Sequence, residues 1–374
     1  MSNKIKLYFK NLNGLRFFAA FMVLICHIEL NKKYFKLTNN REVTRFLGDL
    51  GVDLFFVLSG FLITFLLIKE KEYFEKINFK NFYIRRILRI WPLYYFIVIL
   101  SLFILPKFSI FHINGSFFEF ENNMEAIKIM LLFIFILPNV LYLIKPIAFS
   151  AQTWSIGVEE QFYLIWPFIV NRFKKYKFLF ISVIIIYWLL YWLLSLNFLN
   201  KLPYIELFKN FYALFKIDVL SIGALGAVLY NEKNKICDFV NSRVLFFISI
   251  LLLIVMYFYL SNEVKVFRVI YAILFLIIII NLILNQKLAN LFENKLFNHL
   301  GKISYGIYMY HQILIVLTIN LVLKYFKNIG VIENIIIYSF SIILTLLVSH
   351  LSYLYFETPL LKIKNRFSSF TNEK

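Results

Sequence analysis

The sequence has 374 residues, of which 61% are hydrophobic and only 16% charged, and its formal net charge is +19. This composition excludes a soluble globular domain and predicts a multi-span membrane protein. The positive charge lies in short loops between apolar runs. That pattern is typical of membrane topology and contact with anionic lipids, so we expect no nucleic-acid partner.

Eleven apolar segments predict an all-α, polytopic membrane helix bundle that fills the chain as one domain, residues 1–374. The segments are 12–30, 49–68, 87–105, 126–144, 158–171, 178–196, 211–230, 244–260, 266–285, 303–323 and 334–356. If the N-terminus is cytoplasmic and all eleven cross, 17 Lys and Arg residues lie inside and 21 outside, against the positive-inside rule. If 126–144 dips in and returns, the counts become 24 inside and 14 outside. We therefore predict about ten transmembrane helices, one re-entrant or outer-side segment at 126–144, and two cytoplasmic termini.

The first apolar segment is expected to remain as a span, because it carries Arg16 and His27 and lacks a small-residue cleavage site. Cys26 and Cys237 lie in or beside apolar runs without metal-type spacing. Neither a disulfide nor a metal site is therefore expected.

Arg16 and His27 are costly residues for a membrane span, so each needs a reason to be there. Eleven residues of helix make three turns plus about 20° and rise roughly 16 Å, which places both side chains on one stripe near opposite ends of the span. Ala19, Ala20 and Val23 line that stripe and favour a narrow slot for a long ligand with an anionic head. The alternative is a snorkelling arginine and a histidine that packs between helices.

The second apolar segment opens with GVDLFFVLSGF at residues 51–61. Asp53 enters the membrane at the level of His27, where a carboxylate can hold the tautomer of the imidazole and raise its basicity. The alternative is an aspartate favoured by the helix dipole. Ser59 and Gly60 leave a notch one to two turns deeper, suited to close helix packing or to a ligand.

A basic cluster precedes the third span in RRILRIWPLYY, residues 85–95. On a helix Arg89 lies three and four residues from Arg86 and Arg85, so one face carries all three at the membrane side of Arg16. Guanidinium groups suit fork-type recognition of phosphate. The alternative is ordinary positive-inside anchoring.

The phrase TWSIGVEEQFYLIWP, residues 153–167, opens a span at its outer side. Trp154, Ser155 and Glu159 predict a polar recess on the substrate side rather than a lipid-facing surface. Adjacent residues of a helix point about 100° apart, so Glu159 and Glu160 cannot both face one site.

Polar groups return to the membrane in ISYGIYMYH, residues 303–311, and in FETP, residues 356–359. Tyr305 and His311 are substrate-side candidates, with a structural role for His311 at mid-depth as the alternative. Glu357 lies on the arginine-rich side, where it can neutralise one of those charges. The stretch 178–285 is expected to be scaffold, with Asp218 as its main interior charge.

Together with NGLR at 13–16 and His27, these phrases resemble the acyltransferase-3 family of integral membrane O-acyltransferases. They follow in family order across nearly the whole chain, and Asn13 is a mild departure from the family pattern. The resemblance implies the stand-alone form, without the C-terminal periplasmic hydrolase-like domain of many relatives, in a bacterial inner (cytoplasmic) membrane.

The activity that the resemblance implies is transfer of an acyl group, usually acetyl, from cytoplasmic acetyl-CoA to a hydroxyl of a carbohydrate. Such acceptors include lipopolysaccharide, exopolysaccharide, peptidoglycan and smaller glycosides. His27 is implied as general base or transient acyl carrier, with Asp53 and Glu159 beside it as catalytic candidates. The positions implied to hold the donor are Arg16, Arg85, Arg86 and Arg89. No metal and no obligate protein partner are expected.

Two other functions fit the same residues. A secondary transporter could move an anionic small molecule through the slot between Arg16 and His27 without chemistry, since ten spans with buried charges fit that class as well. An acyltransferase acting on a macrolide, peptide amine or lipid is not separated from a glycan acyltransferase by sequence.

Overall fold

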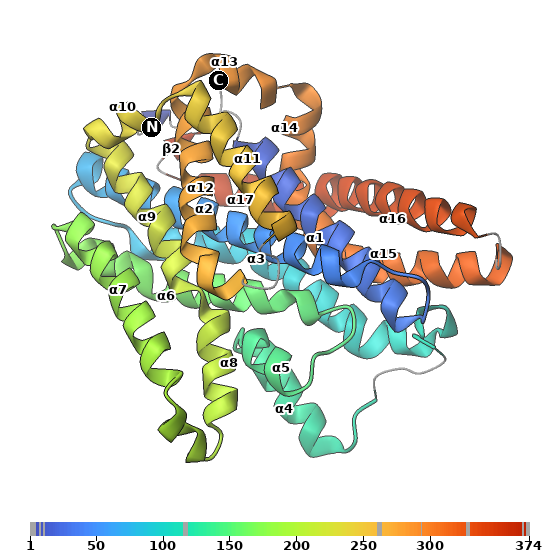
Figure 1. Ribbon diagram of the computed structural model, residues 1–374. Coiled ribbons are helices and arrows are strands. Elements are labelled where there is room, and N and C mark those ends of the chain that lie inside the picture. The colour runs from blue at the N-terminus through green and yellow to red at the C-terminus, as the bar shows by residue number, and fades with distance from the viewer. Residues whose placement is uncertain are drawn as a thin grey trace.

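The computed structural model describes residues 5–6, 9, 12–114, 119–259, 264–292, 294–326, 330–368 and 370–371. This part of the chain is helical almost throughout, and Figure 1 shows the helices gathered into one bundle. The helices are α1 (Leu12–Tyr34), α2 (Arg41–Phe74), α3 (Phe79–Ile99), α4 (Asn123–Ile134), α5 (Pro138–Ile144), α6 (Trp154–Arg172), α7 (Tyr176–Leu194), α8 (Ile205–Phe215), α9 (Ile217–Asn231), α10 (Lys235–Val240), α11 (Arg243–Tyr259), α12 (Val264–Leu284), α13 (Gln286–Phe292), α14 (Lys295–Lys302), α15 (Ser304–Tyr325), α16 (Val331–Ser352) and α17 (Thr358–Arg366). The predicted all-α class is confirmed.

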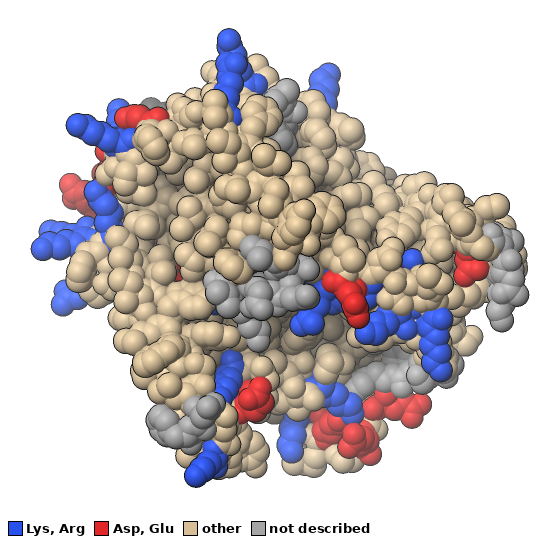
Figure 2. Space-filling view, viewed as in Figure 1, with Lys and Arg blue, Asp and Glu red and all other residues tan. Residues whose placement is uncertain are grey.

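Eight helical stretches of the described chain are long and apolar enough to cross a membrane. Two further predicted spans correspond to α6, which carries two glutamates, and to α11, which has 17 residues. With these two, the helices match the ten predicted crossings. On the face shown in Figure 2, coloured charged residues lie along the upper left margin and in the lower right part, and a broad uncharged zone separates the two groups. The chain is thus a multi-pass membrane protein.

The segment predicted to dip into the membrane, 126–144, consists of two short helices, α4 and α5. Their 12 and 7 residues span only about 18 and 10 Å, too little to cross a bilayer core of about 30 Å. The break between them contains Ile136 in the left-handed region, with φ of 54°, and Pro138 begins α5. This segment therefore does not cross the membrane as one helix, in agreement with the prediction from the Lys and Arg counts.

The two ends of the described chain lie side by side. Strand β1 (Ile5–Lys6) pairs in parallel with strand β2 (Phe370–Thr371). Both ends consequently lie on the same side of the bundle, which agrees with an even number of crossings.

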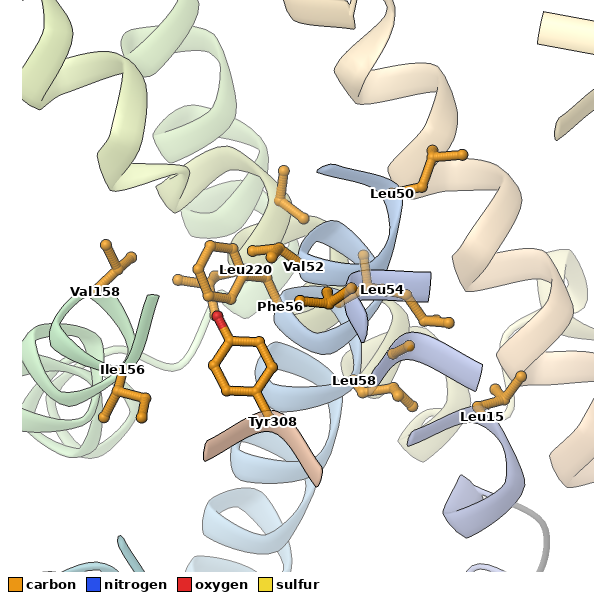
Figure 3. Close-up of a cluster of buried hydrophobic side chains, with 14 of the residues drawn as sticks. Leu15, Leu50, Val52, Leu54, Phe56, Leu58, Ile156, Val158, Leu220 and Tyr308 are labelled. Atoms are coloured by element: carbon orange, nitrogen blue, oxygen red, sulfur yellow. The ribbon is translucent and has the colours of Figure 1, made fainter. Parts of the chain in front are cut away.

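Helix α2 lies at the centre of the bundle, packed against α1 on one side and α9 on the other. A Cβ atom at Gly60 would overlap the carbonyl oxygen of Leu220, and one at Gly223 would overlap that of Val57. The α2 and α9 backbones are therefore in direct contact, which small residues allow in membranes. Figure 3 shows the apolar side chains of α2 that fill the space around this contact. Gly60, one of the two residues of the predicted notch, therefore allows close helix packing.

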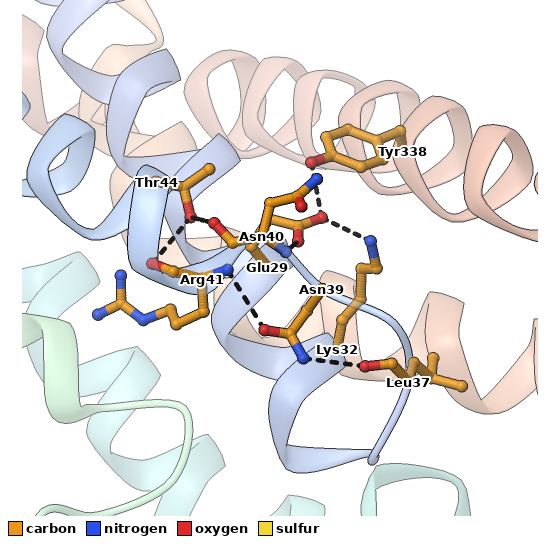
Figure 4. Close-up of polar contacts among 8 residues, drawn as sticks. All are labelled: Glu29, Lys32, Leu37, Asn39, Asn40, Arg41, Thr44 and Tyr338. Carbon is orange, nitrogen blue, oxygen red and sulfur yellow. Dashed lines mark hydrogen bonds and ion pairs between the residues drawn. The ribbon is translucent and has the colours of Figure 1, made fainter. Parts of the chain in front are cut away.

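The helices extend beyond their apolar runs, so the expected loop 31–47 is reduced to a turn between Tyr34 and Arg41. Buried Glu29 holds this turn, because its carboxylate accepts hydrogen bonds from Lys32 Nζ at 2.6 Å, from the Tyr338 hydroxyl at 2.7 Å and from the backbone N–H of Asn40 (Figure 4). Hydropathy does not detect these helix ends, because they are polar.

Candidate active site

A cavity of about 850 Å³ lies between α1, α2, α3, α6, α14, α15 and α17, and its size is typical of cofactor and small-molecule sites. Five cationic side chains and two carboxylates line it, a formal excess of three positive charges. The charged lining residues are Arg16, Arg86, Arg89, Lys302, Lys364, Glu159 and Glu357. The cavity is therefore electrostatically suited to an anion.

Arg16 is positioned from the first turn of α1. Its guanidinium donates to Asn13 Oδ1 at 3.2 Å, and Asn13 Nδ2 donates to Asn298 Oδ1 of α14 at 2.7 Å. A Cβ atom at Gly301 would overlap the Asn13 carbonyl, so α14 lies directly against the start of α1. These contacts fix the direction of the Arg16 side chain and leave most of its donors for a ligand.

Arg86 and Arg89 reach the cavity from α3, whose start is capped by Asn78, with Oδ1 accepting from the Asn81 N–H at 3.0 Å. The Arg86 guanidinium lies 5.7 and 5.4 Å from the ring centroids of Phe82 and Tyr163. Its Nε is buried without a hydrogen-bond partner among the described residues. A buried donor left in this way is a typical mark of a site whose ligand completes the contacts.

Arg85 differs from the prediction. It does not line the cavity, because its guanidinium donates to Glu70 Oε2 at 3.2 Å and to the Phe367 carbonyl at 2.8 Å. The 100° turn between neighbouring residues directs Arg85 toward α2 and the C-terminal segment while Arg86 faces the cavity. The prediction that Arg85 lies beside the other arginines is thus wrong.

The two adjacent glutamates of α6 diverge, as helix geometry required. Glu159 faces the cavity and accepts from Ser59 Oγ at 2.8 Å and from the Tyr163 hydroxyl at 2.9 Å. Glu160 turns to α3 and accepts from Trp91 Nε1 at 2.8 Å. Ser59 therefore lies at the site while its neighbour in the notch packs against α9.

Hydroxyl groups of α6 and α15 also line the cavity. The Tyr308 hydroxyl lies 2.9 Å from the Gln152 carbonyl, which accepts from it, and 2.6 Å from Ser155 Oγ. Tyr305, also of α15, donates to the Ile90 carbonyl at 2.8 Å. In Figure 3 the Tyr308 ring points from α15 between the side chains of α2 and α6.

His27 pairs with His311 rather than with Asp53. His27 Nδ1 and His311 Nε2 are 2.7 Å apart, and the two rings are stacked. His311 Nδ1 lies 3.1 Å from the Ile307 carbonyl, which only accepts. With both rings neutral, His311 therefore carries its proton on Nδ1 and accepts on Nε2, so His27 is protonated on Nδ1. This assignment leaves the lone pair of His27 Nε2 free to accept a proton.

Asp53 does not contact His27. Its Oδ1 accepts from Lys216 Nζ at 2.7 Å, and this ammonium lies 5.8 Å from the ring centroid of Trp154. Trp154 is not among the residues that line the cavity. The expected pairing of Asp53 with the imidazole is wrong because Lys216, between α8 and α9 and remote in sequence, brings a cation to Asp53. Asp218 likewise pairs with Arg268, at 3.1 Å.

The stripe between Arg16 and His27 is not one open slot. Ala19, Ala20 and Val23 are buried in helix contacts, and His27 and His311 are not among the cavity-lining residues. The Tyr308 ring lies 5.9 Å from the His311 ring. Tyr308 thus separates the cavity from the imidazole pair.

Sequence reasoning missed several lining residues that carry charge or polarity: Asn298, Lys302, Lys364, Asn365 and Tyr163. Lys302 stands directly before the 303–311 phrase, and Lys364 follows 356–359 by one helical turn, so proximity to those phrases was the available signal. In the described part of the chain there is no cluster of three or more potential metal-ligating side chains.

Comparison with known proteins shows a match of residues 9–354 to the acyltransferase-3 family model, described as an acyltransferase domain. The chain is 29% identical over 95% of its length to a protein named "Putative O-acetyltransferase" from Staphylococcus aureus (strain COL), of which it covers 58%. It is 33% identical over 45% of its length to "Peptidoglycan O-acetyltransferase OatA" of Listeria monocytogenes, of which it covers 25%. The chain therefore spans less than two thirds of these relatives. No solved structure matches.

Proposed function

The chain belongs to the acyltransferase-3 family, and from this membership we propose that it is a membrane O-acyltransferase that moves an acetyl group from acetyl-CoA to a hydroxyl of a cell-surface carbohydrate. The observation that carries the proposal is that three guanidinium groups line one cavity together with a carboxylate, Glu159, that two hydroxyl groups hold in place. None of the three guanidiniums is ion-paired with a carboxylate of the described residues. Phosphate groups of a donor would supply the missing negative charge.

The donor would lie lengthwise in this cavity. Its phosphate-rich head would meet Arg16, Arg86 and Arg89, and its pantetheine arm would carry the thioester toward Ser155 and Tyr308. Since Tyr308 separates the cavity from the imidazole pair, transfer requires its ring to turn away from Ser155 during the cycle. This orientation supports a cytoplasmic entry for the donor and cytoplasmic chain ends, with the acceptor entering from the opposite side.

His27 would supply the chemistry, because its Nε2 lone pair is free. In direct transfer, Nε2 takes the proton of the acceptor hydroxyl as the oxygen attacks the thioester carbonyl. The carbon–sulfur bond then breaks and the CoA thiolate leaves, taking a proton to become free CoA. In the covalent route, Nε2 itself attacks the carbonyl, the carbon–sulfur bond breaks and the CoA thiolate leaves. In a second step the acceptor hydroxyl attacks the acetyl group, the bond to Nε2 breaks, and the hydroxyl proton passes to the released imidazole. His311 acts in both routes as a positioning residue.

A carbohydrate acceptor is supported by the name of the Listeria relative, which acts on peptidoglycan by that name. We propose a bacterial inner (cytoplasmic) membrane as its location and a glycan or a lipid-linked sugar as its acceptor. Glu159, held by Ser59 and Tyr163, is the carboxylate that an acceptor hydroxyl would meet in the cavity.

The test is release of free CoA from acetyl-CoA by purified protein, measured with a thiol reagent, in separate reactions with peptidoglycan and with lipopolysaccharide. We expect release with one of the glycans, and none from a folded His27→Ala variant. Uptake of intact acetyl-CoA into vesicles without release of CoA would indicate a transporter and contradict the proposal. Acetyl label retained on the wild type without acceptor, but not on His27→Ala, would identify the covalent route.

A further inference from the structure

Helix α17 forms part of the cavity wall, although no phrase of the sequence pointed to it. Leu361, Lys364 and Asn365 line the cavity, and this spacing of three and four residues places them on one helix face. From the other end of the chain, Phe9 lines the same cavity. The paired strands β1 and β2 join the two chain ends beside it. The arginine end of the cavity is thus bordered by both ends of the chain.

Arg85 ties α17 in place. It donates to the Phe367 carbonyl, one residue beyond the helix, and forms an ion pair with Glu70, whose carboxylate is 3% exposed. Glu70 also accepts from the Asn78 backbone N–H at 3.1 Å, so the connection reaches both α2 and the start of α3. A surface tail would not be held by a buried ion pair of this kind. The position of Lys364 is consequently fixed by the fold.

Lys364 adds a cation to a site that is already positive. It shares the cavity with Arg16, Arg86 and Arg89, and none of the four is ion-paired with a carboxylate among the described residues. Five cations and two carboxylates line the cavity, so like charges remain in excess and repel one another, and the repulsion is relieved when a polyanion binds. Burial of Arg86 Nε without a partner points to the same missing ligand. With Lys302 of α14, four elements, α1, α3, α14 and α17, thus supply cations to one cavity.

We propose that Lys364 binds the ribose phosphate of the CoA donor, so that α17 selects CoA over donors that lack this phosphate. The proposal rests on the proposed function. In CoA the ribose phosphate lies at the end of the molecule opposite the thioester. With the thioester directed toward Tyr308, that phosphate is nearest the end bordered by α17. An ammonium group suits a phosphomonoester as a point charge, while the fork-shaped guanidiniums suit the diphosphate.

The test is calorimetric binding of CoA and of dephospho-CoA to purified full-length protein. The variants are Lys364→Gln, Lys364→Arg and, as matched control, Lys362→Gln, whose side chain is exposed on another face of α17. We expect the wild type, the Lys364→Arg variant and the control to bind CoA about 10- to 100-fold more tightly than dephospho-CoA, as for a charge-assisted contact. Lys364→Gln should lose most of this preference while its affinity for dephospho-CoA stays that of the wild type.

Two outcomes would overturn the assignment of Lys364. One is a Lys364→Gln variant with the wild-type preference for CoA. The other is equal loss of affinity for both ligands, which would indicate that Lys364 contacts the diphosphate instead of the ribose phosphate. A wild type that binds neither ligand would instead refute the donor in the proposed function. Elution of each variant as a single folded species separates these results from misfolding.

Discussion

Replacing His311 by phenylalanine tests the role of the stacked imidazole pair. Phenylalanine keeps a flat ring against His27 but removes the Nε2 acceptor, which lies 2.7 Å from His27 Nδ1. One such hydrogen bond contributes about 1–1.5 kcal/mol, which is roughly tenfold in the population of the tautomer with a free Nε2. Loss of orientation adds to this, and partners that orient a catalytic ligand typically contribute 10- to 100-fold. We therefore expect kcat to fall about 10- to 100-fold.

The Michaelis constant for acetyl-CoA should not change in this variant, because His311 does not line the cavity. His311→Gln carries an amide oxygen that can accept from His27 and should recover part of kcat. His112→Phe serves as the control for loss of a histidine, because the His112 ring lies 3.1 Å from the Pro106 carbonyl and does not line the cavity. The assay is initial-rate release of CoA, with thermal stability measured for every variant. An unchanged kcat in a folded His311→Phe protein, or a change confined to the Michaelis constant, would refute the positioning role.

Three further predictions concern the cavity and the core. Arg86→Gln should weaken CoA binding about 10- to 100-fold by calorimetry, because one charge-assisted contact is lost; unchanged affinity would remove Arg86 from the donor site. Lys216→Met leaves Asp53, 1% exposed, without its partner and should cost about 3–5 kcal/mol, seen as a lower Tm. The double variant with Asp53→Asn should recover most of that loss, and failure to recover would contradict the pairing. Gly60→Val should lower Tm, since its Cβ would meet the Leu220 backbone; an unaltered Tm would show that α2 and α9 are not in close contact.

The membrane character and most of the helices follow from the sequence alone. A bilayer offers no water to the backbone, so an apolar run of sufficient length must form a helix, and its position can be found by counting residues. Counting the Lys and Arg residues of the loops along the chain also excluded 126–144 as a crossing segment. The divergence of Glu159 from Glu160 also followed from the 100° turn per residue. Each of these predictions needed only information that is read along the chain.

The partners of the charged groups were decided by tertiary structure. Asp53 was expected to meet His27 because both lie at one membrane level, yet its partner is Lys216, 163 residues away. His27 instead meets His311, 284 residues away. Level in the membrane fixes only one coordinate of a side chain, and the other two depend on how each helix is rotated and which helix packs beside it. Close contacts such as that between Gly60 and Leu220 set those rotations.

The sequence by itself therefore determined that this protein is a helical membrane bundle with an arginine cluster on one face of α3. Only the tertiary structure decided that Arg85 leaves this cluster to hold α17, and that Lys302 and Lys364 join it from α14 and α17. The physical reason is that hydrogen bonds and ion pairs act over a few ångströms. Residues far apart in sequence come within that distance only once the helices are packed.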